Sequence, residues 1–266
     1  MSDRYFARIG IPAPTTPDLD ALRAIVGAHT RSIAFENLNP WTGRDVDIDP
    51  AAVSAKLVDA GRGGYCFEHN TLLREVLDGL GYRTTGLAAR VTWGSAPDAP
   101  PGPRSHMLLR VDLPEGPHLV DVGFGGQTLT GVLALESDVE QPTPHEPFRL
   151  RRHDGVHELQ SLIAGDWRPL YRFDLHEALR PDFEVSNFYV AHHPRSGFVT
   201  GLVGGRPAAD RRYALGGRTL AVHHLGGPSE RRELDSPAEV RDVLERDLLI
   251  DTSGLPDLDE HLARLF

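Results

Sequence analysis

The sequence predicts an α+β protein whose chain divides into three regions. Residues 1–85 carry apolar side chains at helical spacing, and residues 86–196 contain short segments of strand character in close succession. Residues 197–266 mix both patterns. Closely spaced short strands are typical of a β-sandwich or a β-barrel, so we expect one of these in the centre. With 266 residues, the chain can form one large domain or a few small ones.

Three helices are expected in the first region. Thr16–Pro17 fits the N-cap and N1 positions of a helix, and Asp49–Pro50 repeats the pattern before a second one. A third helix begins near Cys66 and is expected to stop at Gly79 and Gly81. Its apolar residues fall on one face at helical spacing: Leu72, Leu73, Val76, Leu77 and Leu80.

Short strands are expected through the second region, with a Pro-Glu-Gly-Pro turn at 114–117 joining two of them. In the third region, Ser236-Pro-Ala-Glu239 is a capping box with proline at N1, which predicts a helix. A strand at 219–224 and a closing helix at 258–265 are also expected. The expected strands of the second region are 87–93, 106–113, 118–123, 148–152, 157–164 and 167–174.

Composition limits the classes of function. The net charge of −10 argues against broad nucleic-acid binding, which needs a basic face. Lys56 is the only lysine, so nearly all of the positive side chains are arginines. The first residues do not resemble a signal peptide, and no apolar stretch approaches the ~20 residues that span a bilayer. A single cysteine therefore indicates a cytoplasmic protein with no disulfide, and we expect no metal site, because no second cysteine stands at ligand spacing.

The single cysteine, Cys66, is the first candidate for chemistry. It follows two glycines and a tyrosine and falls in the first turn of the expected helix, where unpaired N–H groups and the helix dipole favour a thiolate. The glycines are expected to leave room for another molecule to approach the sulfur. The alternative is that Cys66 serves as a small buried hydrophobe, as many free cysteines do.

A nucleophilic cysteine needs a base and a group that orients the base. His69 shares the helix of Cys66, whereas His106 begins a different strand and is the better candidate. Asp121 lies in an apolar strand, where a carboxylate is costly unless it is paired. A symmetric turn would place Asp121 opposite Leu109, roughly 10 Å along the strand from His106 at ~3.3 Å per residue. The spacing therefore favours proximity and leaves the contact open.

Four segments together resemble the arylamine N-acetyltransferase family, in its order and at its approximate spacing. They are Ile33-Ala-Phe-Glu-Asn-Leu38, Arg62-Gly-Gly-Tyr-Cys-Phe-Glu-His-Asn70, Ser105-His-Met-Leu-Leu109 and Leu119-Val-Asp-Val-Gly-Phe-Gly-Gly126. The resemblance runs from Tyr5 to about Leu202. It implies a helical domain (1–85) carrying the nucleophile, an antiparallel β-barrel (86–196) carrying the histidine and aspartate, and an α/β lid (197–266), around a cysteine-protease-like core.

The same resemblance implies a catalytic triad of Cys66, His106 and Asp121. The reaction implied is ping-pong transfer of an acetyl group from acetyl-CoA, a co-substrate, to arylamines, hydrazines or arylhydroxylamines, as in xenobiotic metabolism. No permanent cofactor, nucleic acid or membrane is implied, and the protein is expected to be a monomer or homodimer.

Further residues are assigned by the resemblance with their alternatives open. Glu36 and Arg62 are interpreted as a buried ion pair supporting the cysteine loop. Gly125 and Gly126 either admit the CoA pantetheine or phosphates close to the protein backbone or form a tight turn, and Phe198 and His223 match the donor cleft more weakly. The acceptor pocket is assigned to Phe35, Phe67 and Phe124, and the alternative for the last two is that they belong to the core.

Two other functions fit the same scaffold. An amide synthase that closes macrolactams would take its acyl chain from a carrier protein and use the same triad. A cysteine hydrolase or transglutaminase-like enzyme shares the plan of cysteine on a helix and histidine on a strand, although the Gly-Gly-Tyr-Cys-Phe-Glu context argues against it. A non-catalytic binding module predicts instead that Cys66 reacts no faster than a free thiol.

Overall fold

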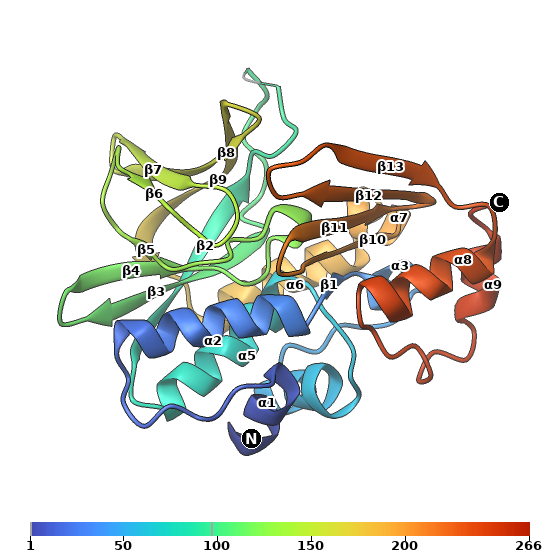
Figure 1. Ribbon diagram of the computed structural model, residues 1–266, viewed down its shortest axis with the longest axis horizontal. Helices are drawn as coiled ribbons and strands as arrows, with labels where there is room; N and C mark the ends of the chain where they lie inside the picture. The colour runs from blue at the N-terminus through green and yellow to red at the C-terminus, as the bar shows by residue number, and fades with distance from the viewer. Residues whose placement is uncertain (1, 97) are drawn as a thin grey trace.

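The structure, a computed structural model, describes residues 2–96 and 98–266. Helices α1, α2 and α5 lie beneath a large curled sheet, and a smaller sheet with α8 and α9 stands beside it (Figure 1). The large sheet has eight strands, all antiparallel, and is nearly closed into a barrel. The predicted α+β class, with a helical part, a barrel and a smaller α/β part, is confirmed.

The N-terminal helices form around apolar faces that pack into one buried cluster. Asp49 caps α4 as predicted, because its side chain accepts a hydrogen bond from Ala51 N. The predicted cap at Thr16–Pro17 is wrong: Asp18 caps α2, since its Oδ1 accepts from Ala21 N at 2.8 Å. The elements are α1 Ser2–Ile9, α2 Leu19–Ser32, α3 Leu38–Trp41, α4 Pro50–Ser54, a π-helical turn Ala55–Asp59, and α5 Cys66–Gly79.

Helix α5 begins at Cys66, as its pattern predicts. The carboxylate of Glu68 reaches back to accept from Tyr65 N at 3.0 Å, which satisfies a donor at the start of the helix. Its apolar face is buried, and Gly81 supplies the left-handed conformation (φ 93°) that ends the helical path. The result is a firmly anchored helix that carries the cysteine on its first residue.

The barrel sheet has the strand order β5-β4-β3-β2-β9-β8-β7-β6. Leucines that alternate along these strands, such as Leu87, Leu108 and Leu159, fill its interior. The predicted strand at 118–123 is too long, because β4 ends at Val120. The strands are β2 Arg83–Val91, β3 His106–Leu113, β4 Gly116–Val120, β5 Leu133–Ala134, β6 Glu140–Gln141, β7 Phe148–His153, β8 Val156–Ile163 and β9 Asp166–Glu177.

Helix α6, Arg180–His192, was not expected from the sequence. Its buried apolar side chains, Phe183, Val190 and Ala191, join the cluster of the N-terminal helices. Val185 and Phe188 are exposed by 73% and 67%, so the apolar residues of α6 do not fall on a single face. That distribution hides the helical period in the sequence.

The lid region forms a second antiparallel sheet with the order β1-β10-β11-β12-β13. Strand β1 comes from the helical region and pairs with β10, so the lid sheet is joined to the segment next to the cysteine loop. Ser236 caps α8 as predicted. The elements are β1 Phe35–Glu36, α7 Gly197–Thr200, β10 Val203–Pro207, β11 Arg211–Gly216, β12 Thr219–His224, β13 Ser229–Glu233, α8 Pro237–Asp242, a π-helical turn Val243–Asp247, and α9 Leu258–Ala263. Within the described residues, no helix is both long and apolar enough to cross a bilayer.

Candidate active site

Cys66 stands at the start of α5 and is 3% exposed. The segment before it runs along β1, where Glu36 N donates to Gly64 O at 2.8 Å. A Cβ atom on Gly63 would lie 2.2 Å from the carbonyl oxygen of Ala34. A Cβ atom on Gly64 would lie 2.6 Å from Oε2 of Glu68. The two glycines therefore make room for the backbone before β1 and for the Glu68 carboxylate, and the expectation that they open a path to the sulfur is wrong.

His106 and Asp121 are in direct contact. The Nε2 atom of His106 lies 2.7 Å from Oδ2 of Asp121, and both side chains are buried. In the β3–β4 hairpin, Leu109 pairs with Val120, one residue short of the register expected from a symmetric turn. Because the chain leaves the ladder after Val120, Asp121 is free to turn its carboxylate toward the first residue of β3. This departure from the strand closes the gap that simple register left open.

Both oxygens of the Asp121 carboxylate are occupied. Oδ1 accepts from Asn70 Nδ2 at 3.1 Å and from Gly123 N at 3.0 Å, while Oδ2 faces His106. Burial would raise the pKa of Asp121, but the charge and hydrogen bond of His106, followed by these two donors, lower it overall. Asp121 is therefore held as a carboxylate, with an orientation fixed from three sides.

The environment of His106 favours its charged form. Burial alone would lower the pKa of His106, but the charge and hydrogen bond of Asp121, with further help from the Cys66 sulfur, raise it to about 10. Because Nε2 is committed to Asp121, Nδ1 is the ring nitrogen that remains for Cys66. The Cys66 Sγ atom also lies 3.7 Å from the carbonyl oxygen of Ser105. The three side chains can therefore move a proton from sulfur to imidazole.

His69 is turned away from this arrangement. Its Nε2 lies 3.1 Å from the Ala34 carbonyl oxygen, and its Nδ1 lies 2.9 Å from His29 Nε2. The Tyr5 hydroxyl completes this buried chain at 2.9 Å from His29 Nδ1. Burial is the main reason that the pKa of His69 falls to about 4. His69 is thus a neutral core histidine, and His106 is the histidine positioned beside Cys66.

Asn70 stands within one of the four family segments, but sequence reasoning gave it no part in the site. Its Nδ2 also donates to Met107 O at 2.8 Å, and its Oδ1 accepts from Val122 N at 3.3 Å. The spacing of four residues from Cys66 places both on one helical face, which is the signal that sequence reasoning could have used. Asn70 therefore ties helix α5 to the strand segments that carry His106 and Asp121.

Gly123 has a steric reason to be glycine. A Cβ atom there would lie 2.7 Å from the Cα atom of Cys66 and 3.2 Å from Cβ of His69. Real Cβ contacts do not come this close to a backbone atom. The segment that follows Asp121 can therefore pass directly against the start of α5 only because this residue has no side chain.

Two aromatic rings pack on the imidazole of His106. The ring of Phe124 meets it edge-on at a centroid distance of 5.1 Å, and Tyr171 lies at 4.8 Å. Phe124 and Tyr171 are themselves 5.2 Å apart. Burial and then the negative charge of Asp121 raise the pKa of Tyr171, so its phenol stays neutral. Sequence reasoning named Phe124 but missed Tyr171, which has no motif around it.

The other aromatic candidates divide into two groups. Phe35 and Phe198 stand together, with ring centroids 5.7 Å apart, and Phe198 is half-buried. Phe67 is fully buried and packs on Tyr65 and Phe183 at 5.7 and 6.1 Å. Phe67 is therefore part of the core, which was the open alternative to a pocket residue.

The residues matched to a CoA site lie where the barrel meets the lid. Gly125 (φ 77°) and Gly126 belong to a 3-10 turn, Gly125–Gln127, that follows Phe124. A Cβ atom on Gly205 of β10 would lie 2.9 Å from Gly126 N, so the lid presses on this turn. His223 is exposed on β12, where its Nδ1 lies 2.8 Å from Ser229 Oγ. The glycines thus form a turn, and their contact with CoA stays a prediction.

Buried charges lie under the cysteine loop. Arg62 contacts Glu36 through Nη2 at 2.7 Å and Nε at 3.1 Å, and Glu36 also accepts from Leu38 N. Lys56 pairs with Glu68 at 2.7 Å. Burial opposes ionisation of Glu36, but Lys56 and Arg62 lower its pKa overall. The two carboxylates are thus matched by two cations, as buried charges require.

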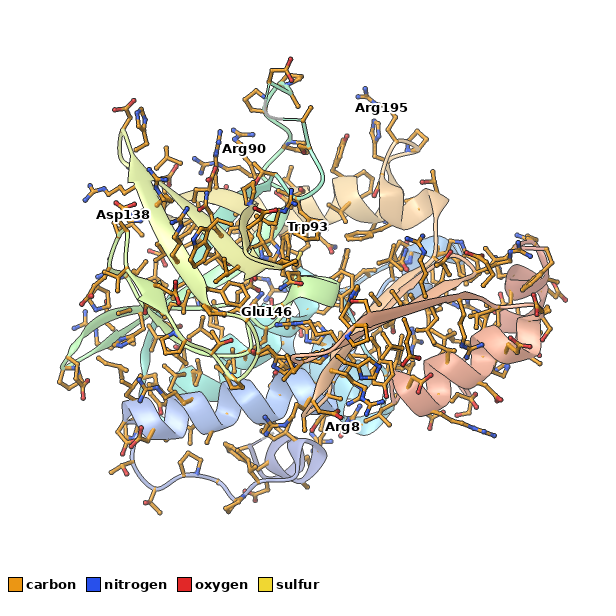
Figure 2. All side chains as sticks on the ribbon, turned by 45° about the horizontal axis from the view of Figure 1, so that its top comes forward. Arg8, Arg90, Trp93, Asp138, Glu146 and Arg195 are labelled. Carbon is orange, nitrogen blue, oxygen red and sulfur yellow. The ribbon has the colours of Figure 1, made fainter. Side chains whose placement is uncertain are left out.

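A separate cavity of about 1120 Å³ is lined by residues 95–96, 99–102 and 104 and by strands β2 and β7–β9. Arg90, labelled in Figure 2, is among its arginines. Several are already paired with carboxylates, such as Arg104 with Asp174 at 2.5 Å and Arg172 with Glu158 at 2.6 Å. None of Cys66, His106 and Asp121 lines this cavity. Within the part of the chain that the structure describes, no group of three acidic, histidine or cysteine side chains could hold a metal ion.

Comparison with known proteins decides the family. A family model described as N-acetyltransferase matches residues 18–254. The chain belongs to the N-acetyltransferase family. The arylamine N-acetyltransferase of Mycolicibacterium smegmatis is 48% identical over 258 residues, covering 96% of this chain and 94% of the relative.

Solved structures of the family extend the agreement to the fold. The Mycobacterium marinum arylamine N-acetyltransferase in complex with CoA has a TM-score of 0.96 at 42% identity, covering 100% of this chain and 99% of that chain. The Salmonella typhimurium enzyme has a TM-score of 0.92 at 32% identity, covering 99% and 96%. The family resemblance seen in the sequence is confirmed, and the protein is an acyltransferase.

Proposed function

We propose that this N-acetyltransferase moves an acetyl group from acetyl-CoA to an arylamine, hydrazine or arylhydroxylamine, with an acetyl-cysteine at Cys66 as intermediate. The alignment of Cys66, His106 and Asp121 carries the proposal, because it couples a thiol to a base and an orienting carboxylate. The names of its relatives specify arylamine acetylation, and the Mycobacterium marinum relative binds CoA.

In the first half-reaction, His106 Nδ1 takes the proton of the Cys66 thiol, and Asp121 balances the charge of the imidazolium. The sulfur attacks the thioester carbonyl, and the backbone N–H groups at the start of α5 stabilise the resulting oxyanion. The bond to CoA sulfur then breaks, and His106 returns its proton to that leaving group. Free CoA departs, and Cys66 holds the acetyl group as a thioester.

In the second half-reaction, the amine nitrogen attacks the acetyl carbonyl and passes its proton to His106. The bond to the Cys66 sulfur breaks, which releases the acetylated amine and restores the thiolate–imidazolium pair. The first half-reaction exchanges the thioester of acetyl-CoA for a thioester on Cys66. Formation of the covalent intermediate therefore changes the free energy little by itself. The advantage is a site with little water, since Cys66 and His106 are each only 3% exposed.

The remaining site assignments are part of the proposal. Phe35 and Phe124 are proposed to line the acceptor pocket, and Gly125, Gly126, Phe198 and His223 to contact the CoA donor. A role in xenobiotic metabolism, a cytoplasmic location and a monomeric or homodimeric state stay predictions.

Mass spectrometry of the intact protein tests the proposal. Incubation with acetyl-CoA alone should add one acetyl group at Cys66, and an arylamine or hydrazine should remove it. Cys66→Ala should fold normally and acquire nothing. Rapid loss of the acetyl group without amine would instead indicate a hydrolase, and labelling only by a bulky acyl thioester would indicate an amide synthase. Failure of the folded protein to form any acyl-cysteine with either donor would overturn the assignment.

A further inference from the structure

Arg212 is the largest fully buried side chain of the described residues, at 1% exposure. It lies on strand β11 of the lid, between Pro207 on β10 and His223 on β12. Its partner Glu146 comes from the barrel side, in the segment before β7, and Figure 2 shows Glu146 where the barrel meets the lid. A buried arginine at this junction calls for a reason, because its desolvation is costly.

The guanidinium of Arg212 is divided between two partners. Its Nε and Nη2 atoms both donate to Oε2 of Glu146, at 2.9 and 2.7 Å, and Nε also lies 3.2 Å from Oε1, so the charged pair is held by several hydrogen bonds. Its Nη1 atom donates to the carbonyl oxygen of Thr128 at 3.0 Å and more weakly to that of Gly126 at 3.4 Å. One side chain of the lid thus holds both a carboxylate and a backbone turn of the barrel.

The turn that Arg212 holds spans residues 124–128. It is closed internally, because Phe124 N donates to Thr128 Oγ1 at 2.7 Å and Thr128 N donates to Gly125 O at 3.1 Å. Gln127 adds a second link, since its Nε2 donates to Glu146 Oε2 at 3.3 Å. Carbonyl oxygens, carboxylate and guanidinium therefore form one connected set of hydrogen bonds.

The same turn carries Phe124, one of the two aromatic residues that pack on the imidazole of His106. Phe124 begins the turn, and its ring packs edge-on against His106 at 5.1 Å. Asp121, which orients His106, stands three residues earlier in the same segment. A shift of the turn would therefore move Phe124 away from His106 and open the site from the lid side.

We propose that Arg212 is a positioning residue for acyl transfer, in which the lid strand β11 fixes the Phe124 turn against His106. This inference rests on the proposed acetyl-cysteine mechanism. The hydrogen bonds of Arg212 go to Glu146, Gly126 and Thr128, and none of them reaches Cys66, His106 or Asp121. Arg212 acts through the turn, and its effect is to keep water from the thioester once Cys66 is acetylated.

The consequence of loosening the turn is a defined side reaction. Water attacks the acetyl carbonyl, the bond to the Cys66 sulfur breaks, and acetate and the free thiol are released. His106 accepts the proton of the water, as it does that of the amine. The ratio of amine transfer to hydrolysis therefore depends on the position of Phe124 against His106. If Arg212 had a purely structural role, its substitution would leave this ratio unchanged.

Arg212→Lys is the test variant, because lysine keeps the charge but cannot span a carboxylate and two carbonyl oxygens. Arg211→Lys is the matched control: the same change one residue earlier on β11, where Arg211 pairs with Asp210 on the surface. We expect Arg212→Lys to hydrolyse its acetyl-cysteine about 10- to 100-fold faster than wild type, the scale of a small displacement near reacting atoms. Arg211→Lys should match wild type.

Both variants are acetylated with acetyl-CoA, freed of donor, and followed by mass in the absence and presence of an arylamine. Hydrolysis by folded Arg212→Lys within twofold of wild type overturns the proposal. If that variant does not fold, Glu146→Gln is tested in its place. It weakens the same Arg212–Glu146 interaction at a side chain that is 21% exposed. Wild-type hydrolysis by Glu146→Gln likewise overturns it. Wild-type protein that never becomes acetylated refutes the proposed function instead. In that case the rate of Cys66 alkylation tests the role of Arg212, and equal alkylation rates in wild type and all variants overturn the positioning proposal.

Discussion

Asp121→Asn tests whether the carboxylate sets the protonation of His106. In the native site, Oδ1 accepts from Asn70 and Gly123, and Oδ2 accepts from His106 Nε2 at 2.7 Å. An asparagine has one acceptor oxygen and one NH2 group. If the oxygen keeps the two donors at Oδ1, the NH2 group takes the place of Oδ2 and faces Nε2.

That exchange reverses the roles of the imidazole nitrogens. Nε2 must then accept a hydrogen bond, so the proton moves to Nδ1, which is the atom that should take the proton of Cys66. The charge that raises the pKa of His106 to about 10 is lost as well. We expect the rate of Cys66 acetylation to fall about 10²–10⁴-fold, as in other triads, which equals about 3–5 kcal/mol in the barrier.

The assay is a single-turnover reaction with acetyl-CoA, in which the acetylated fraction is measured by mass at a series of times. Asp112→Asn is the matched control, since Asp112 lies on the same hairpin and pairs with Arg110 away from the site. Circular dichroism checks that both variants are folded. A folded Asp121→Asn protein that acetylates within tenfold of wild type would refute the tautomer argument and remove Asp121 from the proposed triad.

Three further outcomes are expected. Iodoacetamide should inactivate the protein faster than it alkylates free cysteine at the same pH, and equal rates would contradict activation of Cys66 by His106. Gly123→Ala should lower the free energy of unfolding by about 1–3 kcal/mol in urea, because its Cβ would lie 2.7 Å from Cys66 Cα. Gly102→Ala, with no atom within 4 Å, is its control, and equal effects would contradict the steric argument. The pKa of His69 is about 4 in the folded protein, which is below its value in the unfolded chain. The folded state therefore favours the neutral imidazole, and the free energy of unfolding falls as the pH is lowered through this range. Wild type should therefore lose about 2 kcal/mol relative to His69→Gln from pH 7 to pH 5, and a constant difference would show that His69 titrates normally.

Local signals predicted much of this fold. Asp49, Ser236 and the start of α5 at Cys66 were read correctly, because caps and helical periods act within a few residues. The cap of α2 was misplaced by two residues, since threonine before proline and aspartate after it are both plausible caps. Helix α6 was missed because its apolar residues divide between the core and the surface.

The site shows the same division between local and long-range information. Chain order and motif spacing brought out Cys66, His106 and Asp121, but the contact between the last two depended on where β4 ends. Tyr171 reaches His106 from β9, and Arg212 meets Glu146 across 66 residues of sequence. Such pairs leave no trace in a single sequence, because nothing in either neighbourhood specifies the other.

The pairing of Lys56 with Glu68 has a practical consequence for acyl chemistry on this protein. Lys56 is the only lysine in the chain, and its side chain is 17% exposed and held at 2.7 Å from a carboxylate. The positive side chains on the surface are arginines, whose guanidinium groups do not accept acetyl groups under these conditions. Stray acetylation of side-chain amines by a thioester donor therefore has almost no target, and acetyl groups on Cys66 can be followed by mass with little background from side chains.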